Sequence, residues 1–188
     1  VYAVFQNGRI ASFSVDDAKN RVEGENFADK CKIYAAGDNI DGNVSNTSLL
    51  ISEDGKTLYL RSAFRVRGQK NRIYAFDVES GKKTLVAQNA KKISGDALSG
   101  GELFYSVGSE IMKYDGEEST KICDVEEQIS SVSAGEDFVS VVTDNNNIVK
   151  VNKQGGGKAS VKLSETLNGN YVFSTGENFV AKINSGGV

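Results

Sequence analysis

Short apolar strands separated by polar turns run along most of the chain. One hairpin pattern, two apolar strands around a turn rich in Gly, Asn or Asp, recurs at 2–13, 58–77, 103–114 and 138–151. Its second strand begins at Ile10, Ile73, Ile111 and Ile148, and the last two of these steps are 38 and 37 residues long. Gly, Asn and Asp adopt the positive φ that tight turns need at little cost. The pattern therefore predicts a repeat built from short antiparallel strands.

A further strand precedes and follows the hairpins, which makes the repeat a unit of four strands. The preceding strands are expected at 49–52, 129–134 and 171–175, and the following strands at 83–87, 119–123 and 159–163. Four antiparallel strands in about 35–45 residues form the repeat of a β-propeller blade. We expect an all-β chain with full blades near 48–89, 93–124 and 128–164 and partial blades at both ends. Residues 15–30 are the one candidate region for a short helix, but they show no convincing helical periodicity, so this segment is expected to be a loop.

The number of blades and the closure of the ring stay open at this stage. An all-β sandwich would contain similar short strands, but the four-strand repeat favours a propeller of about four or five blades. One arrangement is a single domain, 1–188, in which the two partial blades combine to close a small ring. The other is a fragment of a larger propeller whose remaining blades lie elsewhere, because both ends look like cuts through a longer structure.

One repeat resembles a known family. Ser52-Glu-Asp-Gly-Lys-Thr-Leu-Tyr-Leu60 is similar to the S-P-D-G-K-x-L-Y-V signature of YVTN/TolB-like β-propellers, and Arg72-Ile-Tyr-Ala-Phe-Asp-Val-Glu-Ser-Gly-Lys82 is similar to the strand and turn that follow it. Glu53 replaces the usual Pro, and later repeats keep short echoes such as Tyr114-Asp-Gly116. The resemblance implies a propeller fold. Because such propellers include binding proteins, envelope factors and a few enzymes, it implies no single function.

The composition excludes several classes of chemistry. The chain has no His, so it has no Ser-His-Asp triad, Cys-His dyad or His-ligated metal. Its two cysteines, Cys31 and Cys123, form no CxxC motif, and their expected places in different blades predict two free, at least half-buried thiols. No apolar run approaches the ~20 residues that span a bilayer. The chain is therefore not expected to insert into a membrane. Because its net charge is −3, it is not expected to bind nucleic acid.

The strongest local charge anomaly is the basic segment 61–72. It contains five cations and no acid, whereas the remaining 17 cations of the chain are set against 25 acidic residues. The five cations are Arg61, Arg65, Arg67, Lys70 and Arg72. Alternating apolar and basic residues predict an extended hairpin arm that turns near Gly68. Arg guanidinium groups suit carboxylate, sulfate and phosphate, so the arm is a docking candidate for an acidic protein or an anionic glycan. The alternative is a solvated hairpin whose arginines pair with nearby acids.

A second candidate is the polar loop 38–47. Asp41, Asn43 and Ser45 alternate as oxygen ligands do in a calcium loop, and Asp38 lies three residues before Asp41. Asn46 stands where such loops have Gly, and no Glu occupies the twelfth position. Turn-forming residues explain the segment better. The sequence therefore predicts no cofactor and leaves calcium at Asp38, Asp41 and Asn43 as the one metal candidate.

Two classes of function follow from these observations. The innermost strands of a propeller line its channel, and among those expected here one carboxylate, Asp96, is present, whereas glycoside hydrolysis needs two. We therefore expect a non-catalytic binding or scaffold module that recognises a protein or glycan. The alternative is a secreted or envelope hydrolase, glycosidase- or lactonase-like, whose site is incomplete in this chain. Many small polar residues and few cysteines favour an extracellular or cell-envelope location, although a cytoplasmic propeller would have a similar composition.

Overall fold

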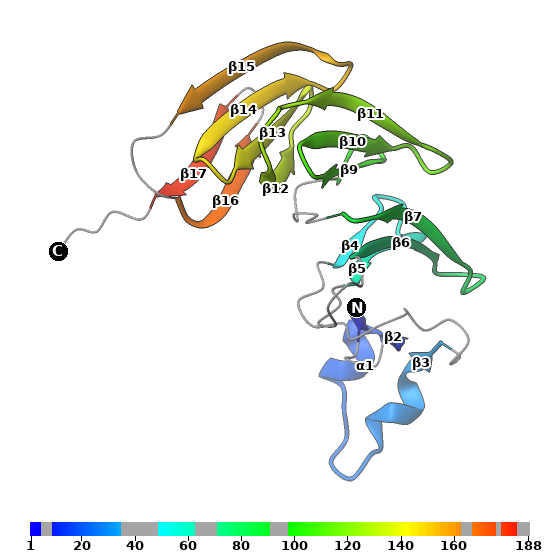
Figure 1. The fold of residues 1–188 in the computed structure, drawn as a ribbon. Coiled ribbons are helices and arrows are strands. Elements are labelled where there is room, and N and C mark those ends of the chain that lie inside the picture. The colour runs from blue at the N-terminus through cyan, green and yellow to red at the C-terminus, as the bar shows by residue number, and fades with distance from the viewer. Residues whose placement is uncertain are drawn as a thin grey trace, which may run out of the picture.

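The computed structural model describes residues 1–4, 9–34, 49–62, 71–90, 98–162, 167–175 and 178–183. These residues form five antiparallel sheets and two short helices. In Figure 1 the sheets follow one another in chain order along an open arc, with the first and the last sheet at its two ends. Neither of the helices in the described part of the chain is long and apolar enough to cross a membrane.

Three consecutive sheets contain four strands each, side by side in chain order. The first comprises β4 (Leu49–Ile51), β5 (Thr57–Ser62), β6 (Arg72–Asp77) and β7 (Lys83–Gln88). The second comprises β8 (Leu98–Ser99), β9 (Glu102–Val107), β10 (Glu110–Tyr114) and β11 (Ser119–Asp124). The third comprises β12 (Ile129–Ala134), β13 (Phe138–Thr143), β14 (Asn147–Asn152) and β15 (Gly156–Lys162). The four-stranded antiparallel unit predicted from the repeat is confirmed.

Smaller sheets flank these three. The N-terminal sheet comprises β1 (Tyr2–Val4), β2 (Ile10–Ser12) and β3 (Lys32–Ile33). The C-terminal sheet comprises β16 (Leu167–Thr175) and β17 (Asn178–Ile183). The arc does not close on itself within the described residues (Figure 1).

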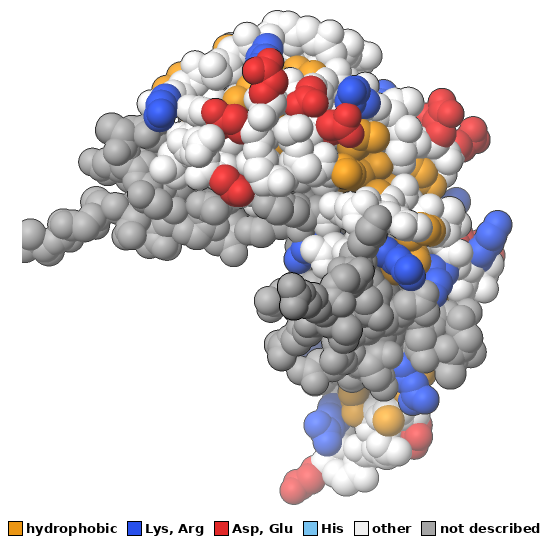
Figure 2. All heavy atoms as spheres, in the orientation of Figure 1, with side chains coloured by type: hydrophobic (Ala, Val, Ile, Leu, Met, Phe, Trp, Pro, Cys, Tyr) orange, Lys and Arg blue, Asp and Glu red, His pale blue; other side chains and the backbone are white. Residues whose placement is uncertain are grey.

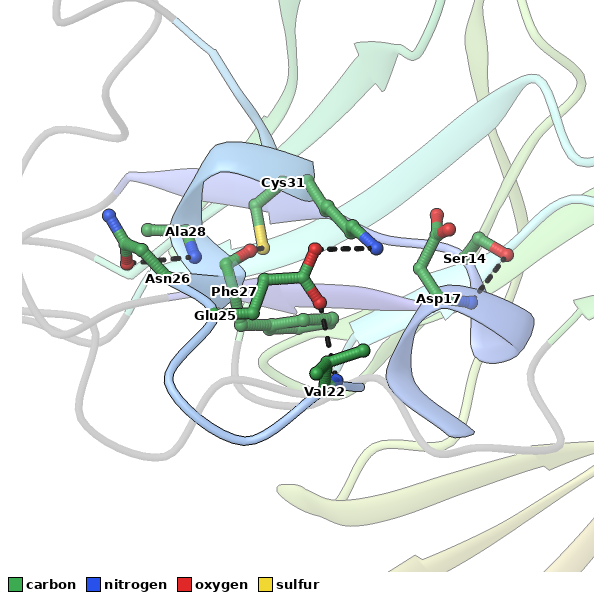
Figure 3. Close-up of polar contacts among 9 residues, drawn as sticks. Ser14, Asp17, Val22, Glu25, Asn26, Phe27, Ala28 and Cys31 are labelled. Carbon is green, nitrogen blue, oxygen red and sulfur yellow. Dashed lines mark hydrogen bonds and ion pairs between the residues drawn. The ribbon is translucent and has the colours of Figure 1, made fainter. Parts of the chain in front are cut away.

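The connection between β2 and β3 contains two short helices, so the expectation of a loop at 15–30 is wrong. The first, α1 (Val15–Lys19), is capped by Ser14, and the second, the 3-10 helix η1 (Phe27–Lys30), is capped by Asn26. In each case the capping side-chain oxygen accepts hydrogen bonds from backbone N–H groups of the first turn, which a helix cannot satisfy internally (Figure 3). Neither helix buries a residue. Local capping therefore forms them, and apolar periodicity could not reveal them.

The same connection is held together by a few polar contacts, which Figure 3 shows, and by one aromatic contact. Glu25 forms an ion pair with Lys30 at 2.8 Å and accepts a hydrogen bond from the backbone N–H of Val22 at 3.4 Å. The hydrogen bond from Lys30 is the main reason why the pKa of the Glu25 carboxyl lies below its usual value. Phe13 and Phe27 meet edge to face, with ring centroids 5.5 Å apart. These contacts fix the connection without a core of its own.

The two central strands of the β4–β7 sheet, β5 and β6, are buried on both faces. In β5, Leu58 and Leu60 point to one face and pack against Ile10 and Tyr34 of the N-terminal sheet. Tyr59, between them, points to the other face and joins a core shared with the β8–β11 and β12–β15 sheets. This explains why the strand is continuously apolar, because a strand covered on both sides needs no polar face. Each fully buried Leu contributes about 1.5–3 kcal/mol.

The edges of the four-stranded sheets differ sharply in exposure. All six residues of β12 are buried, whereas all seven residues of β15, at the opposite edge of the same sheet, are exposed. In Figure 1 β7, β11 and β15 follow the convex side of the arc. These outer strands carry Lys83, Lys121, Lys158 and Lys162. Charged side chains, lysine above all, discourage an exposed strand from pairing with another chain.

Substituting Gly155 tests how closely neighbouring sheets approach. Gly155, in the turn between β14 and β15, has a φ of +79°, and a Cβ there would lie 3.1 Å from the backbone oxygen of Ile122 in the adjacent sheet. We expect Gly155→Ala to lower the free energy of unfolding by at least about 1–2 kcal/mol, because an L residue is strained in this conformation. Chemical denaturation measures the change.

Gly156→Ala is the matched control. Gly156 has no positive φ, and nothing lies within 4 Å of a Cβ added there. Its substitution is expected to change stability by less than about 0.5 kcal/mol. Equal losses in the two variants would contradict the strain expected at Gly155 from its positive φ and its closeness to Ile122.

Candidate functional site

The predicted docking arm begins and ends in one hydrogen-bonded hairpin. Strands β5 and β6 are paired from Thr57 and Asp77 up to Ser62 and Arg72. The connection between them is nine residues long, whereas two residues join β9 to β10 and three join β13 to β14. This one blade therefore departs from its neighbours at the segment that contains Arg65, Arg67 and Lys70, which lie outside the described residues.

The two arginines at the base of the hairpin lie on opposite faces of the sheet. Arg61 is opposite Ile73 in the register and Arg72 is opposite Ser62, and successive pairs of a ladder point to opposite faces. Arg61 is 9% exposed, and burial lowers the pKa of its guanidinium. Arg72 donates from Nη1 to the Tyr74 hydroxyl at 3.3 Å. The alternation predicted for this strand is present, but Arg61 points to a covered face rather than to solvent.

The remaining site predictions fall outside the part of the chain that the structure describes. Asp38, Asp41 and Asn43, the candidate calcium ligands, are not among the described residues, and neither is Asp96. Within the described ranges, no group of three or more Asp, Glu, Cys or His could hold a metal ion. Calcium at 38–43 stays a prediction.

Acidic residues that open the turns have structural roles. Ser52 donates to Asp54 Oδ1 at 2.6 Å, and the same oxygen accepts the Lys56 N–H at 3.0 Å. Gly55, with a φ of +73°, closes this tight turn between β4 and β5, as expected from the sequence. Asp77 repeats the arrangement between β6 and β7, where its Oδ1 accepts the Ser80 hydroxyl and N–H at 2.5 and 2.6 Å. These carboxylates hold turns and are not free for catalysis at Oδ1.

A lysine links the β8–β11 and β12–β15 sheets. Lys153 is 9% exposed, and its Nζ donates to Ser99 Oγ at 2.7 Å, which in turn donates to the Gly135 carbonyl at 2.7 Å. The ammonium also lies 5.2 Å from the centroid of the Phe104 ring. Burial lowers the pKa of Lys153. The contacts join turns of two adjacent sheets and fill the space between them.

A cavity of about 190 Å³ lies between the β4–β7 and β8–β11 sheets. Tyr59, Ala75 and Asp77 line it from the first sheet, and Tyr114 and Gly116 from the second. The rings of Tyr59 and Tyr114 meet edge to face with centroids 6.3 Å apart. Burial raises the pKa of both hydroxyls. None of these residues is in the predicted site, because the cavity depends on how two sheets pack.

Both cysteines are free thiols of intermediate exposure, as the sequence predicts. Cys31 Sγ donates to the Phe27 carbonyl at 3.4 Å (Figure 3). Burial raises the pKa of the Cys123 thiol, which keeps it protonated near neutral pH. Cys123 therefore does not have the environment of a reactive nucleophile.

Comparisons with known proteins support the fold. No protein-family model and no curated protein matches the chain. Among solved structures, BamB from Moraxella catarrhalis is similar with a TM-score of 0.61 at 15% identity, over 98% of this chain and 52% of BamB. Puromycin hydrolase is similar with a TM-score of 0.62 at 10% identity, over 97% of this chain and 33% of the hydrolase. The chain therefore spans about half of the first protein and a third of the second.

At these identities the likeness shows the fold alone. Together with the repeated four-stranded sheets, it shows that the chain has the β-propeller fold predicted from its sequence. The described residues form a partial propeller, an arc of blades in which the sheets pack face to face.

Because carboxylates hold the turns, the stability of the protein is expected to depend on pH, and substitution of Asp77 tests this dependence. The hydrogen bonds from Ser80 hold the pKa of Asp77 below its usual value. This lowered pKa contributes stability above the ordinary pKa, which is lost as the pH falls through the folded-state pKa. Wild type is expected to be more stable than Asp77→Asn at pH 7, and the difference in Tm should shrink between about pH 5 and pH 3.

Glu79→Gln is the control for this experiment. It makes the same charge change in the same turn, and its exposed side chain has no hydrogen bond within the described structure. The difference in Tm between this variant and wild type is expected to stay constant over the same pH range. A matching pH dependence in both variants would assign the effect to net charge rather than to the Ser80 contacts.

Proposed function

We propose that this chain is a non-catalytic propeller module that binds an acidic protein or an anionic glycan through the arm at the end of the β5–β6 hairpin. One observation carries the proposal. The connection between β5 and β6 is nine residues long where the matching connections have two or three, and the segment from Arg61 to Arg72 holds five cations and no acid.

The charge of the neighbouring blades supports a local role for the arm. Residues 98–162, which contain the next two sheets, carry eleven acidic residues against six lysines and no arginine. In Figure 2 acidic side chains gather over the upper sheets, whereas Lys and Arg side chains predominate over the lower ones. Because the rest of the chain is acidic, anionic groups are attracted to the basic segment 61–72 rather than to a whole face of the protein.

We place the contact residues of this proposal between the two ends of the arm. Arg61 is buried against the next sheet and Arg72 bonds to Tyr74, so these two anchor the ends of the arm. Arg65, Arg67 and Lys70 are the three proposed contact residues. Guanidinium groups pair with carboxylate or sulfate through two parallel hydrogen bonds, which Lys cannot do.

The family and the location are part of the same proposal. The hydrogen-bonded turn at 52–57 and the β6 strand that follows fit the YVTN/TolB-like repeat that the sequence resembles, and we assign the chain to that kind of propeller. Its composition fits an extracellular or cell-envelope protein, and further blades of a larger chain would continue the arc. The hydrolase alternative requires a second carboxylate beside Asp96, and it stays a prediction.

Binding to two defined polyanions tests the arm. Heparin serves as the anionic glycan and poly-L-glutamate as the acidic protein, and fluorescence polarisation at increasing NaCl measures Kd. We expect wild type to bind at least one of them, with an affinity that falls as salt rises. The triple variant Arg65→Gln, Arg67→Gln, Lys70→Gln should bind about tenfold more weakly, because three cations that would pair with the polyanion are removed.

The control removes three cations elsewhere. The control variant combines three substitutions on the exposed outer strands β11 and β15: Lys121→Gln, Lys158→Gln and Lys162→Gln. It changes the net charge by the same amount as the arm variant. This variant is expected to retain at least half of the wild-type affinity. Failure of wild type to bind either polyanion, or an equal loss in both triple variants, would contradict docking through the arm.

A further inference from the structure

The three four-stranded sheets can be aligned residue by residue through their registers. Near the end of the third strand of each sheet there is a matching pair: Leu58 opposite Phe76, Leu103 opposite Tyr114, and Val139 opposite Val151. Two residues later along the chain come Val78, Gly116 and Lys153. The backbone N–H groups of Val78 and Lys153 make the same hydrogen bond, to the carbonyl of the residue before the second strand, at 2.8 and 2.9 Å. These three positions are therefore equivalent.

In two of the three sheets, the side chain at this position fills the gap to the preceding sheet. Val78 packs with the cluster formed by the N-terminal and β4–β7 sheets, and its carbonyl accepts the Tyr34 hydroxyl at 3.1 Å. Lys153 covers Phe104 of the β8–β11 sheet. Gly116 has no side chain, and there the cavity of about 190 Å³ remains.

A second small residue enlarges the same cavity. Ala75 lies opposite Tyr59, whereas the matching pair in the next sheet is Lys113 opposite Phe104. The space between the β4–β7 and β8–β11 sheets therefore has an alanine and a glycine at positions where the next pair of sheets has two lysines, Lys113 and Lys153. Because no long side chain occupies either position, a cavity bounded by the rings of Tyr59 and Tyr114 remains between the two sheets.

The groups around the opening are polar as well as aromatic. Tyr59 is 3% exposed, and its hydroxyl has no hydrogen-bond partner among the described residues. Asp77 is held ionised by Ser80 at Oδ1, and Lys82 and Thr84 also line the opening. Tyr114, which also lines the cavity, donates to the Gly116 carbonyl at 2.7 Å.

We infer that this cavity, defined by Tyr59, Ala75, Asp77, Tyr114 and Gly116, binds one neutral pyranose ring of a sugar. A cavity of about 150 Å³ holds benzene, so the volume here suits a six-membered ring. An apolar ring would cover the Tyr59 hydroxyl without giving it a hydrogen bond, which costs affinity. A sugar presents an apolar ring face to tyrosine and hydroxyl groups to Asp77, Lys82 and Thr84.

This site is separate from the proposed arm. Asp77 is the last residue of β6, whereas the arm ends at Arg72, the first residue of β6, so the cavity and the arm lie at opposite ends of the same strand. The inference therefore does not rest on the proposed function. The arm triple variant is expected to keep its affinity for sugar, which distinguishes failure of one idea from failure of the other.

Saturation-transfer NMR with glucose, galactose, mannose and N-acetylglucosamine tests the site, and isothermal titration measures Kd for any that bind. We expect at least one sugar to bind wild type. Ala75→Met fills the cavity and should weaken binding at least tenfold. Tyr59→Phe removes one hydroxyl without changing the volume and should weaken binding about three- to tenfold.

Matched variants keep the test independent of folding. Thr84→Ala lies at the cavity and should weaken binding, whereas Thr120→Ala, also an exposed threonine on an outer strand, should not. The melting temperature of each variant shows whether it folds. If Ala75→Met does not fold, the affinities of Tyr59→Phe and Thr84→Ala for sugar still test the site.

Three outcomes would overturn the inference. In the first, none of the four sugars binds wild type. In the second, a sugar binds equally to wild type and to folded cavity variants. In the third, phenol binds in the cavity and the sugars do not, which would assign the opening to an apolar ring.

Discussion

Face-to-face packing of neighbouring sheets is the constraint on which the rest of this structure depends. Each four-stranded sheet is narrow, and its strands carry apolar residues on both faces. Leu58 and Leu60 pack toward one neighbour while Tyr59 packs toward the other. A sheet of this kind is not stable alone, because water would reach both faces. The apolar faces of each sheet are therefore buried only because neighbouring sheets cover them, and each sheet depends on its neighbours for stability.

Because the faces are covered, the chain presents other parts of each blade to its surroundings. These parts are the outer strands, the turns and the connections. Lysines occupy the outer strands, and carboxylates such as Asp54 and Asp77 hold the turns. The long β5–β6 connection and the opening beside Gly116 interrupt this regular pattern. Both candidate binding features arise where one blade differs from the others, as expected when a repeated scaffold acquires a specific site.

Arg61 shows why a pattern of alternating residues predicts a face but not its exposure. Its place beside Tyr59, on the face opposite Leu60, follows from the period of two in a strand. In a two-layer protein the polar face would meet solvent, and the arginine would be available for docking. Here a second sheet covers that face, so Arg61 is buried. Only Arg65, Arg67 and Lys70 are left as contact residues of the proposed arm.

The sequence by itself determined the all-β class, the four-strand repeat and the turn chemistry at Ser52–Thr57, because these depend on residues close together in the chain. It did not reveal α1 and η1, whose caps act within a few residues without an apolar face. Only the tertiary structure decided that Lys153 fills one gap between sheets and that Gly116 leaves another open. The width of such a gap depends on side chains from two sheets, and no local periodicity records how they meet.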